Sequence, residues 1–278
     1  MANVRNVNSM QNPHHTLKLG WFSTGGGEGS RGLLLSTLTA IENGTLNAEI
    51  EFVFCNREPG EDIGTDAFLE IVASHNIPTI CLSSRQFAKT RKTRFSSVRQ
   101  EYDTLVLSKL ARFTARTCVL AGYMLVLSPS VCETYQLLNL HPAKPSGPIG
   151  TWREVIELLI NDRQRESGIM MHIATKEVDQ GPVLSYCTFP IRDSGTDALW
   201  DNLDHAEQKV DHSEEIATVK DQLFTSVRSK QLLYERPFFV ETLRALANER
   251  IKSLDVPLDL TKEVNQSLAP EESDSSSE

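Results

Sequence analysis

The sequence predicts an α/β fold: a doubly wound, mostly parallel sheet that ends in a β-hairpin and is followed by a helical C-terminal extension. Short apolar runs alternate with helix-spaced segments throughout residues 17–162, a pattern typical of a parallel sheet with helices on both faces. Two later apolar runs, 167–175 and 181–191, are joined by the turn sequence KEVDQ and predict the hairpin. A length of 278 residues with 40% hydrophobic residues suits one large α/β domain or two small ones.

Each element follows from its local pattern. In the first helix, Leu34, Leu38 and Ile41 recur at helical spacing before Gly44, which predicts its end. Pro237 stands near the first position of the last helix, where a missing N–H costs least. The expected strands are 17–24, 49–56, 78–84, 117–124 and 137–142, and the expected helices are 33–44, 66–77, 97–112, 128–135, 151–162, 196–210, 213–234 and 237–253.

The charge is acidic overall and unevenly distributed. The chain has 28 basic and 37 acidic residues, a formal net charge of −9, which argues against a nucleic-acid binder because phosphate contacts need a basic surface. Residues 255–278 hold seven acids and one Lys, whereas the stretch from Arg85 to Arg99 holds six basic residues and no acid. We expect this basic stretch to be a solvated loop or to steer anionic substrates.

The composition divides the chain into four parts. We expect a flexible leader over 1–16, a catalytic domain over 17–192, a helical extension over 193–254 that packs on it, and an acidic, disordered tail over 255–278. A homodimer through the helices of the extension is the alternative to packing. No apolar run approaches the roughly 20 residues of a membrane span, and the N-terminus lacks the apolar core of a secretory signal. We therefore expect no membrane association and a cytoplasmic location.

The cysteines form no CxxC pair. Their odd number and scattered spacing indicate reduced, buried thiols, and we expect no metal site. The five residues are Cys55, Cys81, Cys118, Cys132 and Cys187.

A glycine-rich segment, GGGEGSRG over 25–32, stands between the first strand and the first helix. Backbone N–H groups at such a helix start favour an anion, and Ser30 and Arg31 add a hydroxyl and a charge, so a phosphate monoester is the expected ligand. The spacing of Gly27, Gly29 and Gly32 also satisfies a dinucleotide fingerprint. No acidic residue follows the second strand to bind a ribose, so a dinucleotide-binding oxidoreductase is only a distant alternative. The structural alternative is that the glycines form a tight turn and bind no ligand.

Asn139 and His141 stand at the end of the expected strand 137–142 and share one face by alternation. An amide donor beside an imidazole suits acyl transfer, because the amide stabilises an oxyanion and the imidazole moves a proton. Asp179, in the turn of the hairpin, would hold the imidazolium if it folded back onto His141. The structural alternatives are that His141 only stabilises a turn and that Asp179 is only a common turn residue of the hairpin. His172, on the hairpin, is expected to be structural.

These motifs together resemble the folate-dependent formyltransferases. The quoted segments occur in order: GSR at 29–31, LAGYMLVLSP at 120–129, LLNLHP at 137–142 and the G-x-x-x-H…VDQGPV run at 168–183, with a weaker match in 226–251. The resemblance implies transfer of a formyl group from 10-formyltetrahydrofolate, as co-substrate, to the amine of glycinamide ribonucleotide in purine biosynthesis. The implied partners are small molecules, with neither nucleic acid nor membrane.

The resemblance also assigns roles to residues. The amine would attack the formyl carbon, Asn139 would stabilise the tetrahedral oxyanion, and His141 with Asp179 would move protons. The implied binding residues are Gly29, Ser30, Arg31 and Arg99 for the phosphosugar, and Met124, Leu125, Val126 and Leu127 for the folate, with backbone from 175–179.

The sequence departs from the family pattern around the implied triad. Leu125 stands where Arg is usual and Arg31 where Asn is usual, and the segment 85–96 is longer and more basic than expected. The loop after His141 reads AKPSGPIG, and about 20 extra residues lie near 200–222. Two alternatives therefore remain: a formyltransferase for another amine, such as an amino sugar nucleotide, or a catalytically inactive protein that binds a folate or a phosphate ligand.

Overall fold

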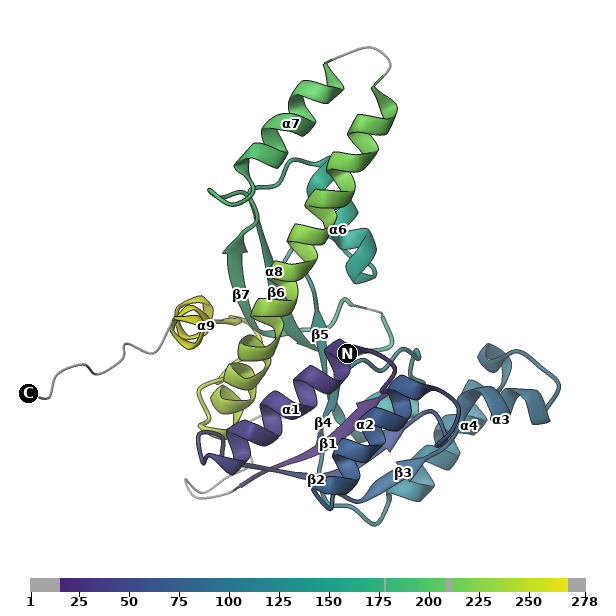
Figure 1. Ribbon diagram of the computed structural model, residues 1–278. Helices are drawn as coiled ribbons and strands as arrows, with labels where there is room; N and C mark the ends of the chain where they lie inside the picture. The colour runs from purple at the N-terminus through teal and green to yellow at the C-terminus, as the bar shows by residue number, and fades with distance from the viewer. Residues whose placement is uncertain (1–15, 178, 209–211, 270–278) are drawn as a thin grey trace, which may run out of the picture.

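The computed structural model describes residues 16–177, 179–208 and 212–269 (Figure 1). Eight strands form one sheet in the order β3-β2-β1-β4-β5-β6-β7-β8. They are β1 Leu17–Ser23, β2 Ala48–Cys55, β3 Thr79–Cys81, β4 Thr117–Leu120, β5 Gln136–His141, β6 Glu166–Ile173, β7 Val183–Pro190 and β8 Leu258–Asp259. The first five strands pair in parallel, β6 runs antiparallel to β5 and to β7, and β8 is parallel to β7. The predicted fold class and the hairpin are thereby confirmed.

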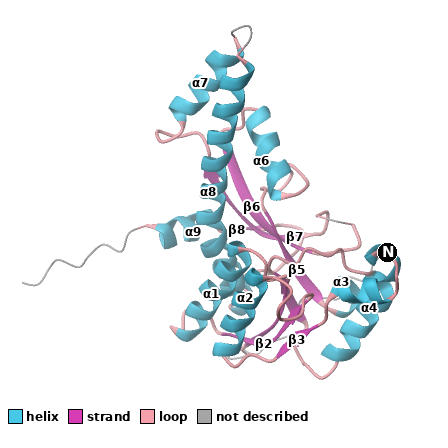
Figure 2. Ribbon diagram, turned by 45° about the vertical axis from the view of Figure 1, so that its right-hand side comes forward, coloured by secondary structure: helices cyan, strands magenta, loops and turns pink. Residues whose placement is uncertain are grey.

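Helices cover both faces of the sheet (Figure 2). Along β1, Trp21 packs into the core on one face and its neighbour Phe22 into the core on the other, as strand alternation requires. One core contains residues of α1, α2, α6, α7 and α8, and the other contains residues of α3, α4 and α5. The bounds are α1 Glu28–Glu42, α2 Ile63–Ser74, α3 Ser84–Thr90, α4 Phe95–Leu110, α5 Pro129–Thr134, α6 Trp152–Asn161, α7 Asp197–Glu207, α8 Ser213–Ala247 and α9 Thr261–Leu268.

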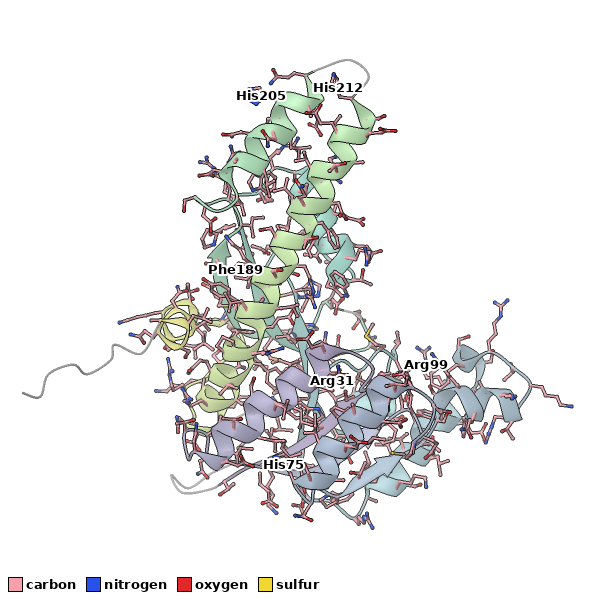
Figure 3. The ribbon with its side chains drawn as sticks, in the orientation of Figure 1. Arg31, His75, Arg99, Phe189, His205 and His212 are labelled. Atoms are coloured by element: carbon pink, nitrogen blue, oxygen red, sulfur yellow. The ribbon has the colours of Figure 1, made fainter. Side chains whose placement is uncertain are left out.

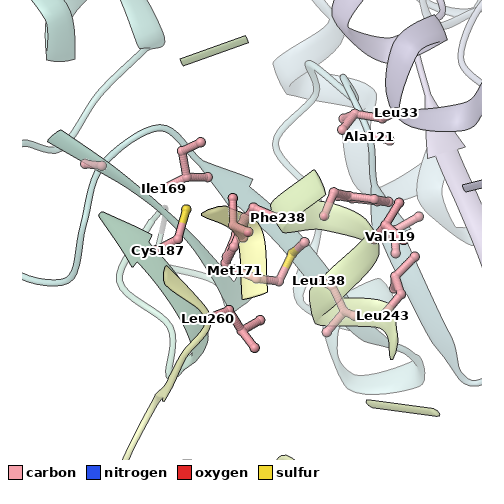
Figure 4. Packing of buried hydrophobic residues seen from close by; sticks show 14 of the residues in the cluster. Leu33, Val119, Ala121, Leu138, Ile169, Met171, Cys187, Phe238, Leu243 and Leu260 are labelled. Atoms are coloured by element: carbon pink, nitrogen blue, oxygen red, sulfur yellow. The ribbon is translucent and has the colours of Figure 1, made fainter. Parts of the chain in front are cut away.

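Helix α8 packs on the sheet. In Figure 4, Phe238 and Leu243 of α8 lie among Val119, Leu138 and Met171 of the sheet. The other half of α8 projects beyond the sheet beside α6 and α7 (Figure 1). Within the described ranges no helix is both long and apolar enough to cross a membrane.

The expected helix break at Pro237 is wrong, because α8 continues through it. Proline inside a helix removes one N–H and crowds the carbonyl four residues back, at a cost of about 3 kcal/mol. Phe238 and Phe239 follow directly and are fully buried. Burial of each such side chain is worth about 1.5–3 kcal/mol, so packing against the sheet outweighs the cost of the proline.

Three further expectations need correction. The expected strand 117–124 ends at Leu120, since the following residues form a loop. Part of the expected loop in the basic stretch is α3, with Phe87 buried against α4. The expected disordered tail contains β8 and α9, and Leu260 and Val264 are fully buried there. Most of the expected leader, 1–15, and the last residues, 270–278, lie outside the described residues.

Candidate active site

The candidate site begins at the carboxyl end of β5. Asn139 and His141 lie on the same side of that strand, and the imidazole of His141 is only 2% exposed. The antiparallel register of β5 and β6 places His172 directly opposite Asn139. The sheet edge formed by the ends of parallel strands is where open α/β sheets bind ligands.

The loop between β6 and β7 brings Asp179 to this pair. One carboxylate oxygen of Asp179 lies 3.2 Å from Nδ2 of Asn139, and the other lies 3.7 Å from Nδ1 of His141. Asp179 has a left-handed φ of 56°, which Asp tolerates better than most residues. A Cβ on Gly181 would lie 1.7 Å from the carbonyl oxygen of Ile173, so the return of the chain requires glycine there.

His172 takes part in the same network. Its Nε2 lies 3.0 Å from Nδ2 of Asn139, and its Nδ1 lies 3.2 Å from the carbonyl oxygen of Ile173. A carbonyl only accepts, so Nδ1 carries the proton and Nε2 accepts from the amide. His172 therefore orients Asn139. Sequence reasoning gave His172 only a structural role, because its register opposite Asn139 is visible only once the strand pairing is known.

The protonation of His141 follows from its other neighbour. Nε2 lies 2.9 Å from the carbonyl oxygen of Pro148, so Nε2 carries a proton and donates it to that carbonyl. Proton exchange is left to Nδ1, which faces Asp179. The loop after His141 thus fixes the imidazole through its backbone, although its side chains depart from the family pattern.

The pKa of the Asp179 carboxyl lies below its ordinary value. The main lowering effect is the interaction with His172, whose Nε2 lies 3.6 Å from Oδ1 of Asp179, and the positive charge of His141 adds to it, while burial acts in the opposite direction. The carboxylate is therefore ionised and can hold an imidazolium at His141.

The glycine segment forms the start of α1. Gly27 is the N-cap and no side chain caps the first turn, so backbone N–H groups there face outward. A Cβ added at Gly27 or Gly29 would meet no atom within 4 Å, which leaves open space in front of this backbone. The hydroxyl of Ser30 donates to the carbonyl of Gly27 at 2.8 Å, and Arg31 donates to the carbonyl of Gly64 at 3.3 Å.

Arg99 lies on α4, apart from the glycine segment. Figure 3 shows Arg31 at the start of α1 and Arg99 at the start of α4. Arg99 precedes Asp103 by one helical turn, and the carboxylate of Asp103 accepts a hydrogen bond from the N–H of Ser128 at 2.7 Å. Burial raises the pKa of Asp103, and the charge of Arg99 acts against this.

The expected folate residues form the loop between β4 and α5. Met124 is 73% exposed and Val126 is 50% exposed, whereas Leu125 and Leu127 pack against the core. Backbone N–H of Met124 donates to the hydroxyl of Thr24 at 3.2 Å, which ties this loop to the segment after β1. In the described ranges no group of three or more His, Cys, Asp or Glu side chains could hold a metal.

Comparisons with known proteins identify the family of the chain. A family model described as formyl transferase matches residues 27–219. The chain is 30% identical over 200 residues to phosphoribosylglycinamide formyltransferase of Dictyostelium discoideum, covering 67% of this chain and 90% of that one. It is 29% identical over 170 residues to the protein of the same description from Escherichia coli, covering 59% and 70%.

Solved structures share the fold. Glycinamide ribonucleotide transformylase 1 from Symbiobacterium toebii superposes with a TM-score of 0.61 at 17% identity, covering 86% of this chain and 91% of that chain. A formyltetrahydrofolate deformylase from Pseudomonas syringae gives 0.59 at 15% identity, covering 86% and 64%. The chain belongs to the formyl transferase family. Within that family it is an enzyme of the folate-dependent formyltransferase type.

Proposed function

We propose that the protein transfers the formyl group of 10-formyltetrahydrofolate to the amine of glycinamide ribonucleotide. The convergence of Asn139, His141 and Asp179 at one lip of the sheet carries this proposal. The similarity to two proteins described as phosphoribosylglycinamide formyltransferase supports the choice of acceptor. The open backbone at Gly27 and Gly29 supports a phosphorylated acceptor, because a helix start favours an anion.

In the proposed reaction the acceptor amine attacks the formyl carbon, and the bond from that carbon to N10 of the folate breaks. The amine loses a proton and N10 gains one. His141 can relay this proton through Nδ1, and the Asp179 carboxylate stabilises the imidazolium that forms in between. The amide of Asn139 stabilises the negative charge on the formyl oxygen in the tetrahedral intermediate.

Asn139 must change one partner to play this role. Both hydrogens of its Nδ2 are directed to protein acceptors, one to His172 and one to Asp179. The hydrogen that faces Asp179 is the one available for an oxyanion, since the bond to His172 is shorter and more buried. We infer that Asp179 releases this hydrogen when the formyl oxygen arrives, while its other carboxylate oxygen stays near Nδ1 of His141, where it stabilises an imidazolium without blocking the proton relay.

A formyl-transfer assay tests the proposal. The full chain is incubated with 10-formyltetrahydrofolate and glycinamide ribonucleotide, and formylated product and free formate are both quantified. Parallel reactions contain amino sugar nucleotides or no acceptor. We expect product with glycinamide ribonucleotide and little formate without it.

The other outcomes separate the alternatives. Product with an amino sugar nucleotide only would overturn the proposed acceptor and keep formyl transfer. Formate release that needs no acceptor would indicate hydrolysis, the activity named for the Pseudomonas syringae structure. Folate binding without either product would identify a binding protein.

A further inference from the structure

A cavity lies over the carboxyl ends of β1, β2 and β3. Its volume is about 530 Å³, within the range of about 300–1,000 Å³ that small-molecule sites occupy. The lining residues come from the loops after the three strands, from α3, from the start of α4 and from the 124–127 loop; they are Thr24, Asn56, Arg57, Ser84, Arg85, Ala88, Lys89, Thr93, Phe95, Met124 and Leu125.

The lining contains three cations and no acid. Arg57 is held in place, because its Nη1 lies 3.0 Å from both Asp62 and Thr65. Arg85 and Lys89 stand one turn apart on α3, and neither forms a hydrogen bond or an ion pair with the described residues. Burial acts to raise the pKa of the nearby Glu61 carboxyl, but hydrogen bonds from Ser83, Gln86 and the backbone of Glu58 lower it below its ordinary value, and the charge of Arg85 adds the smallest part. Like charges at this spacing repel, and an anion between them would remove the repulsion.

Neutral groups complete the wall. Asn56 accepts a hydrogen bond from Thr24 at 2.8 Å and lies within 3.4 Å of the Ser84 hydroxyl. Phe95 and Leu125 supply an apolar surface on the other side. Because a bare phosphate fills only a small part of about 530 Å³, the shape suits an anionic group attached to an apolar chain or a planar ring.

This cavity adjoins the predicted folate site, because Met124 and Leu125 line it, but it differs from the predicted phosphate site and from the triad. None of Gly29, Ser30 and Arg31 lines it, nor does any residue of the triad. Leu125, which stands where the family usually has Arg, contributes no charge to it. Its free cations come instead from α3, within the segment that is longer and more basic than the family pattern.

We propose that Arg85 and Lys89 form a second anion-binding site, which takes a carboxylate or a phosphate carried on an apolar or planar body. Both sources exist among the proposed substrates, since a folate carries glutamate carboxylates and the acceptor carries a phosphate. The choice of ligands rests on the proposed function, but the test measures binding without turnover, so failure of the site and failure of the proposed reaction can be told apart.

Calorimetric titration of the full chain tests this site. The double variant R85Q/K89Q removes its free cations, and K92Q/R94Q, in the same basic stretch but outside the cavity, removes an equal charge. The probes are tetrahydrofolate with one and with five γ-linked glutamates, glycinamide ribonucleotide, and inorganic phosphate. Thermal melting of each variant checks folding, which these exposed positions should not disturb.

We expect R85Q/K89Q to weaken one class of probe by about tenfold or more, as loss of charged hydrogen bonds does, and K92Q/R94Q to leave it nearly unchanged. Loss confined to the pentaglutamate form identifies carboxylates as the ligand, and loss for glycinamide ribonucleotide and phosphate identifies a phosphate. Equal affinities of the two double variants for every probe would overturn the site, because the cations would then act only by long-range attraction.

Discussion

The two halves of the sheet's carboxyl edge differ in how their polar groups are satisfied. Over β5 to β7, Asn139, His141, His172 and Asp179 contact one another, and little of them is exposed. Over β1 to β3, the N-terminal turn of α1 has no side-chain cap, and the cations of α3 face a cavity. In the β5–β7 half the polar side chains are paired with one another, whereas the β1–β3 half presents unpaired backbone donors and positive charge.

This difference separates chemistry from binding. Groups that must hold a fixed geometry in the transition state gain from being preorganised by neighbours. Groups that bind a charged ligand gain from having no competing partner in the protein, since a competitor would have to be displaced. Substitutions in the first half should therefore reduce kcat, and those in the second half should raise KM.

The largest effect is expected from His141→Ala. Loss of the proton relay should lower kcat for formyl transfer by about 10²–10⁴-fold, with KM for both substrates nearly unchanged. Steady-state kinetics measure both constants. His75→Ala is the matched control, because His75 pairs with Glu42 at the far end of α2 (Figure 3). If His141→Ala weakened substrate binding and left kcat unchanged, His141 would have no catalytic role. The expected difference between the β5–β7 half and the β1–β3 half of the edge would then be wrong.

Asn139→Ala should have the next largest effect. Loss of one oxyanion donor lowers kcat by about 10²–10³-fold. His172→Ala should lower kcat less than Asn139→Ala does, because His172 orients the amide of Asn139 and need not touch the formyl group. Single-turnover rates at saturating folate separate the two variants. Equal losses of kcat in the two variants would mean that His172 contacts the reacting formyl group. His172 would then be a catalytic residue beside Asn139, His141 and Asp179.

The fold class and the order of the motifs could be predicted from the sequence, because both depend on local patterns. Alternation along β5 places Asn139 and His141 on one side, and the apolar runs define the strands. The position of Asp179 beside His141 was predicted through the resemblance and not from local pattern, because it depends on a left-handed φ and on the close contact of Gly181 with Ile173. Such contacts join residues that local pattern does not relate.

The missed elements have the same cause. At Pro237 a local rule was overridden by burial of the two residues that follow it. In α3, Ser83 caps the helix and Phe87 packs against α4, but the density of charge in this stretch concealed both signals. In α9, a single buried Val264 anchors a helix of polar composition.

Gly29→Ala tests the binding half with a smaller effect. The new methyl group meets no protein atom and Ala favours a helix, so thermal stability should stay equal or rise slightly. If the acceptor phosphate approaches this backbone, KM for glycinamide ribonucleotide should increase about tenfold, with kcat unchanged. Gly32→Ala is the contrasting variant, because its Cβ would lie 2.5 Å from Nε of Arg236, so that flexible side chain must move while the backbone at Gly29 stays as it is. Unchanged KM in Gly29→Ala would place the phosphate elsewhere.

The smallest effect concerns the dependence of stability on pH. The pKa of Asp179 lies below its ordinary value of 3.8, so its ionised form stabilises the folded protein above that value, and this contribution is lost as the pH falls through the lowered pKa. Asp179→Asn removes the titrating group. The difference in unfolding free energy between the wild type and this variant should therefore shrink from about pH 5 to about pH 3, as measured by urea denaturation. Asp221→Asn, which removes an exposed carboxyl on α8, should show no such trend. If this difference in unfolding free energy stayed constant with pH, His141 and His172 would not stabilise the ionised carboxylate of Asp179. The charges of the β5–β7 half would then be no better paired than those of the β1–β3 half.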